Sequence, residues 1–298
     1  MKKFRAAILL LTTTFFWGVT FTVVKDAIER VDVFVFLSQR FLIAAAIMLP
    51  FALMRANRAS VKLLTHGTLL GVLLFASYAF QTVALKYTSA SNAGFLTGLN
   101  VLFVPLLGAL LFRLPIGNNI RWGVGLATPG LFLLCGNGSL AFNQGDLLAT
   151  VCGACVALHL LFTSRFARHE GSDVYLLTAL QLAVVGLLSL AGAGLRGQKV
   201  LVWHPELFWT LVVCVLIATV FAFLVQTSMQ RFISPAHTAL IFCTEPVFAA
   251  GYAYYAAGER LGLFGFLGAA LILAGMVISE LLPDEAREAG SEAVAAEG

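Results

Sequence analysis

Long apolar segments recur along this chain, separated only by short polar stretches. A helix needs about 20 residues to cross the roughly 30 Å hydrocarbon core of a membrane. The chain holds ten windows of that kind, at about residues 5–24, 34–54, 67–85, 92–112, 122–140, 147–166, 175–195, 207–226, 236–256 and 262–282. The pattern predicts an all-α membrane protein with ten transmembrane helices. One misjudged Gly-rich window would make the number nine or eleven.

The composition excludes a soluble fold. Of the 298 residues, 60% are hydrophobic and 11% are charged, whereas a soluble domain carries about 25% charged residues. Because a globule of this size still exposes roughly a quarter of its unfolded surface, the apolar excess must face a lipid bilayer. We expect the N-terminal segment to remain as the first helix, since its apolar stretch is too long for a signal peptide. The small, acidic residues of 284–298 predict a disordered tail.

Lysine and arginine residues, which favour cytoplasmic loops, predict the orientation. With the N-terminus inside, the inner side holds Lys2, Lys3, Arg5, Arg55, Arg58, Lys62, Arg113, Arg121, Arg165, Arg168, Arg231 and Arg287, and the outer side only Lys25, Arg30, Lys86, Arg196, Lys199 and Arg260. We therefore expect both termini in the cytoplasm. Cations scattered in this way form no basic face, so we expect no nucleic-acid partner.

An internal repeat predicts the architecture. The segment that starts at Gln81 aligns without gaps with the segment that starts at Gln226, and a slightly different register sets 34–40 against 175–181. Since each unit has an odd number of helices, the second copy must be inverted relative to the first. Inverted repeats around a midplane site are the design of many secondary transporters. The alternative is two apolar stretches that look alike by composition.

We place the first repeat at residues 1–140 and the second at 141–283, with five helices in each. Several segments resemble a known family: Trp17-Gly18, Arg40-Phe41, ALKYTSASNAGFLTGLNVLFVPLLGALLFR, and TEPVFAAGYAYYAAGERLGLFGFLGAALILAGMVI. In this order and spacing they are similar to the EamA-type drug/metabolite transporter superfamily, over residues 5–282. The resemblance implies ten helices in two inverted five-helix repeats around a central cavity. It also implies transport of amino acids, bases or related small metabolites, often outward, across a bacterial inner membrane. One departure is Leu114-Pro115, where the second repeat has Glu259-Arg260.

Glu245 is the most informative polar residue. It lies near the middle of the ninth window, where a charge costs at least about 2.5 kcal/mol and usually faces a cavity or a partner. The next residue, Pro246, has no N–H and so frees the carbonyl of Phe242. Asn100 occupies the matching position of the first repeat. Glu245 is our candidate for proton coupling or amine binding; the alternative is a protonated side chain that serves packing.

Arg40 is the candidate for binding an anion. It lies about 10 Å below the outer end of the second helix by helical rise. Three interpretations remain open: the side chain extends to the membrane interface, it pairs with Glu245, or it holds a substrate carboxylate in a bidentate grip.

The remaining candidates for substrate binding are polar or aromatic: Trp17, Gln81, His159, Gln181, Gln226 and Tyr252. His159 could also exchange a proton, and the glutamines are cavity donors or interhelical links. The aromatic side chains stack on a planar ligand or face lipid. Cys152-x-x-Cys155 has no histidine or acidic neighbour, so we interpret it as small-residue packing and expect neither a metal nor a cofactor.

No ATP-binding motif occurs, so transport would be driven by a gradient. We interpret the chain as a secondary transporter, a monomer or weak homodimer, that exports a small-molecule substrate by alternating access. Amino acids are the first expected substrates, with purines or amphipathic compounds as alternatives. An intramembrane enzyme would need catalytic motifs that are absent here. A channel, unlike a carrier, would show neither saturation nor counterflow.

Overall fold

The computed structural model describes residues 2–84, 86–88, 90–135, 143–200, 205–256 and 262–282, and every regular element in these ranges is helical. The helices are α1 (Lys2–Arg30), α2 (Val33–Leu53), η1 (Ala56–Arg58), α3 (Val61–Ala84), α4 (Ala90–Gly98), α5 (Asn100–Phe112), α6 (Asn118–Cys135), α7 (Gln144–Ala167), α8 (Val174–Leu195), η2 (Pro205–Leu207), α9 (Phe208–Val215), η3 (Leu216–Phe221), α10 (Ala222–Met229), α11 (Pro235–Phe242), α12 (Glu245–Ala256) and α13 (Leu263–Leu281). The all-α prediction is confirmed for the described residues. The predicted disordered tail at 284–298 lies outside them.

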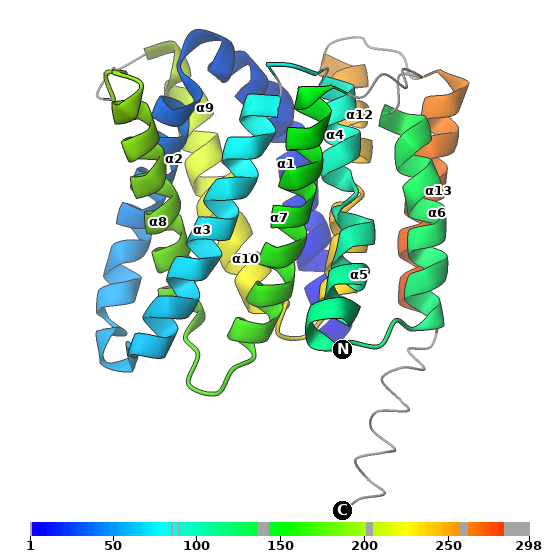
Figure 1. Cartoon of the computed structure of the whole chain (residues 1–298), viewed down its shortest axis with the longest axis horizontal. Helices are drawn as coiled ribbons and strands as arrows, with labels where there is room; N and C mark the ends of the chain where they lie inside the picture. Colours follow the sequence, from blue (N-terminus) through cyan, green and yellow to red (C-terminus); the bar gives the residue numbers. More distant parts are fainter. Residues whose placement is uncertain are drawn as a thin grey trace, which may run out of the picture.

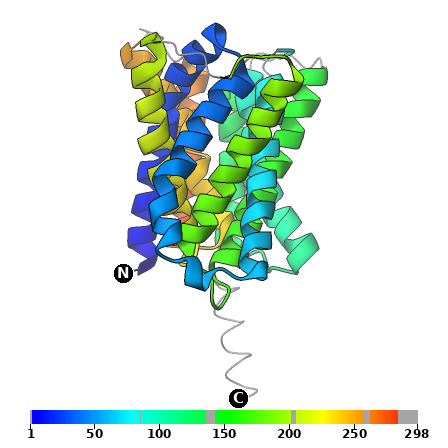
Figure 2. The same ribbon diagram turned by 90° about the vertical axis from the view of Figure 1, so that its left-hand side faces the viewer.

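The helices form one bundle in which long segments lie side by side (Figures 1 and 2). The first and last helices meet at one end, where Lys3 Nζ lies 3.8 Å from Glu280 Oε2. We call this the N-terminal end of the bundle. The connections between α2 and α3 and between α7 and α8 lie at the same end (Figure 1).

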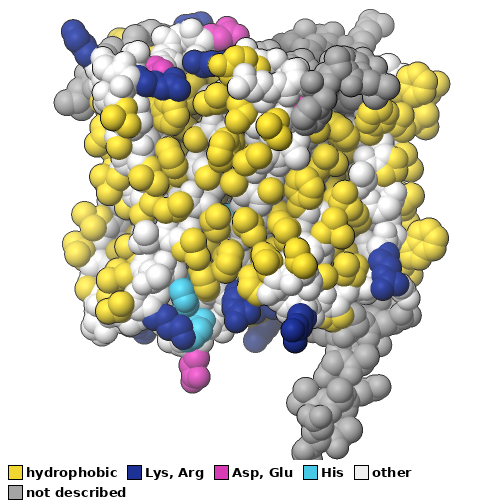
Figure 3. All heavy atoms as spheres, in the orientation of Figure 1, with side chains coloured by type: hydrophobic (Ala, Val, Ile, Leu, Met, Phe, Trp, Pro, Cys, Tyr) yellow, Lys and Arg dark blue, Asp and Glu magenta, His cyan; other side chains and the backbone are white. Residues whose placement is uncertain are grey.

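Seven helical segments of the described chain are long and apolar enough to cross a membrane. They are Val33–Leu53, Val61–Ala84, Ala93–Phe112, Gln144–Ala167, Val174–Leu195, Phe208–Met229 and Leu263–Leu281. α6 packs against α13 and α1 packs against α10, so both helices lie alongside the seven. On the face shown in Figure 3, exposed apolar side chains form a broad band across the middle of the bundle, and most exposed charges lie at its two ends. This surface is suited to a bilayer.

Two predicted windows are each divided into two helices. The window 236–256 is interrupted at Cys243 and Thr244, between α11 and α12. Pro246 explains this break, because proline has no N–H to donate to the preceding turn of the helix. At the break, the N–H of Thr244 donates to the carbonyl oxygen of Ile241, three residues earlier, at 3.1 Å. The window 92–112 is interrupted at Leu99, between α4 and α5. The disturbed backbone beside Glu245 was predicted from Pro246, whereas the break at Leu99 was not predicted.

Glycines bring α6 and α13 into backbone contact. A Cβ atom added to Gly268 would lie 2.5 Å from Gly130 O, and one added to Gly275 would lie 2.6 Å from Gly123 O. Small residues of this kind allow the close helix packing that membrane proteins use in place of a hydrophobic driving force.

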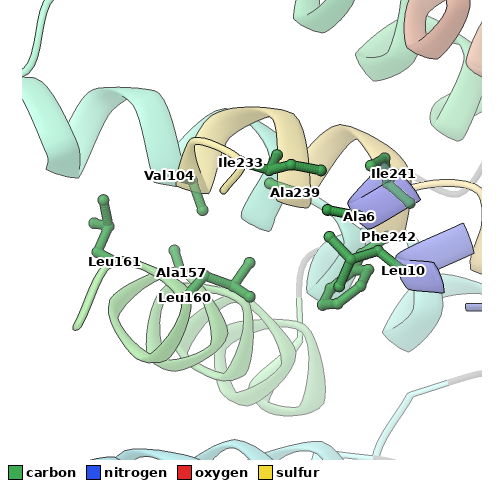
Figure 4. Packing of buried hydrophobic residues seen from close by; sticks show 10 residues of the cluster. All are labelled: Ala6, Leu10, Val104, Ala157, Leu160, Leu161, Ile233, Ala239, Ile241 and Phe242. Carbon is green, nitrogen blue, oxygen red and sulfur yellow. The ribbon is translucent and has the colours of Figure 1, made fainter. Parts of the chain in front are cut away.

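α2 and α8 form a second closely packed pair, with an ion pair at each end. Asp32 caps the start of α2 and lies 3.7 Å from Arg196 at the end of α8. Asp173 caps the start of α8 and lies 3.5 Å from Arg55, which follows α2. In the interior, a cluster of apolar side chains joins α1, α5, α7 and α11 near the N-terminal end (Figure 4). These contacts position the polar residues described next.

Candidate functional site

A wide turn in the middle of the segment Phe208–Met229 organises the site. Residues Leu216–Phe221 (η3) form a π-helix, a rare element that often marks functional positions. The hydroxyl of Thr219 donates to the carbonyl oxygen of Cys214 at 2.8 Å. The carbonyl oxygen of Ala218 accepts hydrogen bonds from Trp17 Nε1 at 2.9 Å and from Arg40 Nη2 at 3.1 Å. The turn therefore joins α1 and α2 to the second half of the chain.

Arg40 is buried, with 4% of its surface exposed. Its Nε donates to Thr219 Oγ1 at 2.6 Å, and its Nη2 donates to the carbonyl oxygen of Ala218. The guanidinium carbon lies 5.7 Å from the centre of the Tyr78 ring. No described carboxylate forms an ion pair with it. Two of the three interpretations were thus wrong: Arg40 neither extends to the interface nor pairs with Glu245.

The arrangement leaves a positive charge in the interior with neutral partners only. A guanidinium has five N–H groups, and only Nε and Nη2 donate to described atoms. A buried charge without a counter-charge is costly. Arg40 is therefore suited to bind an anionic group of a ligand.

Glu245 begins α12, directly after the break in the helix. A carboxylate is favourable there, because the first N–H groups of a helix carry partial positive charge. Glu245 is half-buried and has no hydrogen bond or ion pair with a described residue. Its backbone packs closely on α1: a Cβ atom added to Gly18 would lie 2.8 Å from Glu245 O.

Trp17 forms an aromatic wall of the same region. Its ring centre lies 5.0 Å from that of Phe242 and 5.7 Å from that of Phe223. Because its N–H is used by Ala218, Trp17 offers a ligand an apolar surface rather than a hydrogen-bond donor.

His159 and Gln181, both predicted candidates, contact each other. His159 Nε2 lies 2.9 Å from Gln181 Oε1, and Gln181 Nε2 donates to Thr227 Oγ1 at 3.1 Å. Because the amide nitrogen of Gln181 is the donor to Thr227, its oxygen accepts from His159, which assigns the proton to Nε2. The edge of the His159 ring packs against Phe223, 6.4 Å between centres. Phe223 thus separates this chain of hydrogen bonds from Trp17.

The other candidates make no contact with Arg40 or Glu245 in the part of the chain that the structure describes. Gln226 donates to Gln230 Oε1 at 3.3 Å, and its own oxygen is buried without a partner. Asn100 donates to Thr97 O at 3.0 Å, and its oxygen is likewise buried without a partner. Gln81 and Tyr252 are half-buried.

Several residues of the site had not been predicted from the sequence: Thr219, Phe223, Thr227 and the carbonyl of Ala218. Thr219 is one polar residue in the otherwise apolar run LVVCVLIATVFAFLV, and that isolation was the available signal. Phe223 and Thr227 carry no comparable signal. No group of three or more potential metal ligands occurs among the described residues, and Cys152 and Cys155 are free thiols. The site can bind and orient a ligand through charge, hydrogen bonds and aromatic surface.

Comparison with known proteins gives consistent results. A model of the "EamA-like transporter family" matches residues 4–136 and again residues 143–281. An uncharacterized transporter of Archaeoglobus fulgidus is 31% identical over 285 residues, which cover 94% of this chain and 87% of that protein. The uncharacterized transporter YyaM of Bacillus subtilis is 27% identical, with 93% and 94% covered. The uncharacterized inner membrane transporter YedA of Escherichia coli K12 is 24% identical, with 89% and 87% covered.

A solved crystal structure has the same fold. It superposes with a TM-score of 0.78 at 20% sequence identity, and the match covers 93% of this chain and 96% of that one.

Proposed function

This chain belongs to the EamA-like transporter family, and from that premise we propose that it is a secondary transporter that exports amino acids across a bacterial inner membrane. Membership in the family makes it a membrane transporter and not an enzyme. The observation that carries the proposed substrate class is the pair of interior charges, Arg40 and Glu245, neither of which has a charged partner among the described residues.

An α-amino acid complements these two charges. Its carboxylate would accept hydrogen bonds from the free N–H groups of Arg40, and its ammonium group would be bound by Glu245. The Tyr78 ring lies beside the Arg40 guanidinium, and Trp17 would supply an apolar surface for the side chain of the amino acid. A purine or an amphipathic cation would use Glu245 and the aromatic rings but would leave Arg40 unpaired. Such a ligand is therefore the second candidate.

We propose ten membrane crossings in two inverted five-helix repeats, 1–140 and 141–283, with both termini in the cytoplasm. The two separate matches of the family model support two units. The broken helices support them as well, since Asn100 begins α5 and Glu245 begins α12 at aligned positions. α1, α6 and the α11–α12 pair would be the crossings beyond the seven apolar segments.

The two ends of the α2–α8 pair support inversion in particular. The same separation of 141 residues relates Asp32 to Asp173 and Arg55 to Arg196. Each aspartate caps its own helix and pairs with the arginine of the other unit. Each arginine also lies over the aromatic ring two residues after the aspartate: Arg55 over Tyr175 at 4.0 Å, and Arg196 over Phe34 at 4.7 Å. A two-fold axis between inverted units would produce this pattern.

Transport would proceed by alternating access to a central cavity between the repeats. Discontinuous helices are the usual means of placing polar backbone and charge at the midplane of such proteins. Glu245 would carry the coupling proton. His159 is a weaker candidate for that role, because its proton is already shared with Gln181.

Reconstituted vesicles provide the test. The purified chain in proteoliposomes would be given labelled amino acids and nucleobases, and counterflow and the response to a pH step would be measured. We expect saturable counterflow of amino acids in the wild type. Glu245→Gln should lose the pH-driven component and retain exchange, whereas Arg40→Lys should raise KM at least about tenfold, because a lysine cannot reproduce the forked contact.

Glu29→Gln and Arg121→Lys, at exposed positions near the two ends of the bundle, are the matched controls and should behave as the wild type. Flux without saturation or counterflow would instead indicate a channel. Transport of every panel member unchanged in both site variants would disprove the assigned site.

A further inference from the structure

A second polar site lies at the N-terminal end of the bundle, away from Arg40 and Glu245. It is a cavity of about 480 Å³ between the start of α3 and the turn that joins α7 to α8. The side chains that matter for its chemistry are Arg58, Lys62, His66, His169, Glu170 and Ser172, all of which line it. The transport proposal uses none of them.

The arginine in this cavity shares one carboxylate with a second arginine. Arg58 Nη1 lies 3.2 Å from Asp173 Oδ2, and Arg55 Nε lies 3.5 Å from the same oxygen. Asp173 is buried, so this contact holds the η1 turn against the start of α8. Two arginines against one aspartate leave a net positive charge beside the cavity, and this charge favours an anion.

Lys62 is a second cation that lines the cavity. Its Nζ lies 2.6 Å from His169 Nε2, and His169 Nδ1 lies 2.6 Å from the carbonyl oxygen of Glu170. A carbonyl can only accept, so Nδ1 carries the proton and Nε2 accepts from Lys62. His169 is thus neutral, and Lys62 has no carboxylate partner among the described residues.

Two further groups in the cavity can donate to an anion. His66 stacks on Phe166, with 3.8 Å between ring centres and 2° between planes, and its ring lies 5.7 Å from that of His169. The hydroxyl of Ser172 is buried and has no hydrogen-bond partner in the described chain. Two cations, imidazole rings and a free hydroxyl around one concavity match the many acceptor oxygens of a phosphate. The Glu170 carboxylate also lines the cavity and offsets part of this positive charge.

We propose that this cavity binds a phosphate group, presented by an anionic lipid of the leaflet at the N-terminal end. Val61 and Leu64 of α3 are exposed apolar residues, and they lie at the edge of the lipid-facing surface next to the cavity. In Figure 3 the histidine side chains lie at the lower edge of the apolar band, with basic side chains near them. Basic pockets at this level are typical sites for anionic head groups. Free phosphate shares the same chemistry, so the test separates the two sources.

The test is native mass spectrometry of the full chain in detergent with dioleoylphosphatidylglycerol or dioleoylphosphatidylcholine added. We expect the wild type to retain the anionic phosphatidylglycerol in preference to the zwitterionic phosphatidylcholine. Lys62→Gln should weaken that retention about fivefold, the effect of one cation near an anionic head group. Arg121→Gln is the control, because Arg121 is an exposed cation at the same end whose side chain contacts Asn118, outside the cavity.

Ser172→Ala is the second variant, and it removes a hydroxyl that bonds nothing in the described protein. It should weaken retention without lowering the melting temperature, so a folding defect cannot imitate the result. If retention is unchanged but inorganic phosphate raises the melting temperature of the wild type and not of Lys62→Gln, the ligand is free phosphate. Equal retention in Lys62→Gln and Arg121→Gln, with no phosphate effect, would overturn the proposal.

Discussion

At the scale of single residues, the site depends on how a buried arginine is held. Arg40 is fixed by the Thr219 hydroxyl and the Ala218 carbonyl, both neutral groups of one π-helical turn. Such groups orient the guanidinium without cancelling its charge. The charge therefore remains available to a ligand, which an ion pair with Glu245 would have prevented.

Thr219→Val tests this arrangement. The variant keeps the shape of the side chain but removes the acceptor for Arg40 Nε and the donor to Cys214 O. A hydrogen bond to a charged group contributes about 1.5–3 kcal/mol, so we expect KM for an amino-acid substrate to rise tenfold or more. Thr219→Ser retains the hydroxyl and should stay close to the wild type. If the serine variant is as impaired as the valine variant, the hydroxyl has no such role.

At the scale of helices, close approach of backbones decides which elements can pack. α6 offers a matched pair of glycines for a test. A Cβ atom at Gly130 would lie 2.8 Å from Gly268 O, whereas one at Gly125 would meet nothing within 4 Å among the described atoms. Alanine at either position raises the helix propensity of α6, but only at Gly130 does it also disturb the packing against α13. A comparison of the two variants therefore measures the effect of packing alone.

We expect Gly130→Ala to destabilise the protein by about 1–3 kcal/mol, the usual cost of overpacking. Gly125→Ala should be neutral or slightly stabilising, because alanine favours the helix by about 1 kcal/mol. Thermal unfolding in detergent, followed by size-exclusion chromatography, measures both. Equal melting temperatures would show that α6 and α13 can separate without cost.

Prediction from the sequence succeeded where a single residue type determines the outcome. The apolar windows predicted the helices, and Pro246 predicted a disturbed backbone beside Glu245 because proline has no N–H. The break at Leu99 has no proline at the break itself, since Pro105 lies within α5. The π-helical turn depends on contacts with Trp17 and Arg40, which are 201 and 178 residues away from Ala218. Contacts between residues so far apart in the chain produce no local sequence pattern from which the π-helical turn could be predicted.

At the scale of the whole molecule, α2 and α8 are joined at both ends by Asp–Arg pairs. Asp173 is buried and meets two arginines, whereas Asp32 is partly exposed and meets one, at 3.7 Å. Asp173→Asn keeps the helix cap, because asparagine caps as well as aspartate, and removes only the charge. We expect it to destabilise the protein by roughly 1–2 kcal/mol, between an exposed and a buried ion pair.

Asp32→Asn, the equivalent change at the other end, should cost less than about 1 kcal/mol. The melting temperatures of the two variants, compared at low and high salt, show which substitution destabilises the protein more. A larger loss in Asp32→Asn than in Asp173→Asn would contradict the description of the two ends.

The distance along the chain between Arg40 and its partners also has a consequence for biosynthesis. Thr219 is made 179 residues after Arg40, which at about 5–20 residues per second takes on the order of ten seconds or more. During that time a nascent α2 carries an uncompensated charge that the hydrocarbon does not tolerate well. We expect the newly made α2 to remain at the translocon or at the membrane surface. It should insert to its final depth only after the segment Phe208–Met229 has been synthesised and can contact Arg40.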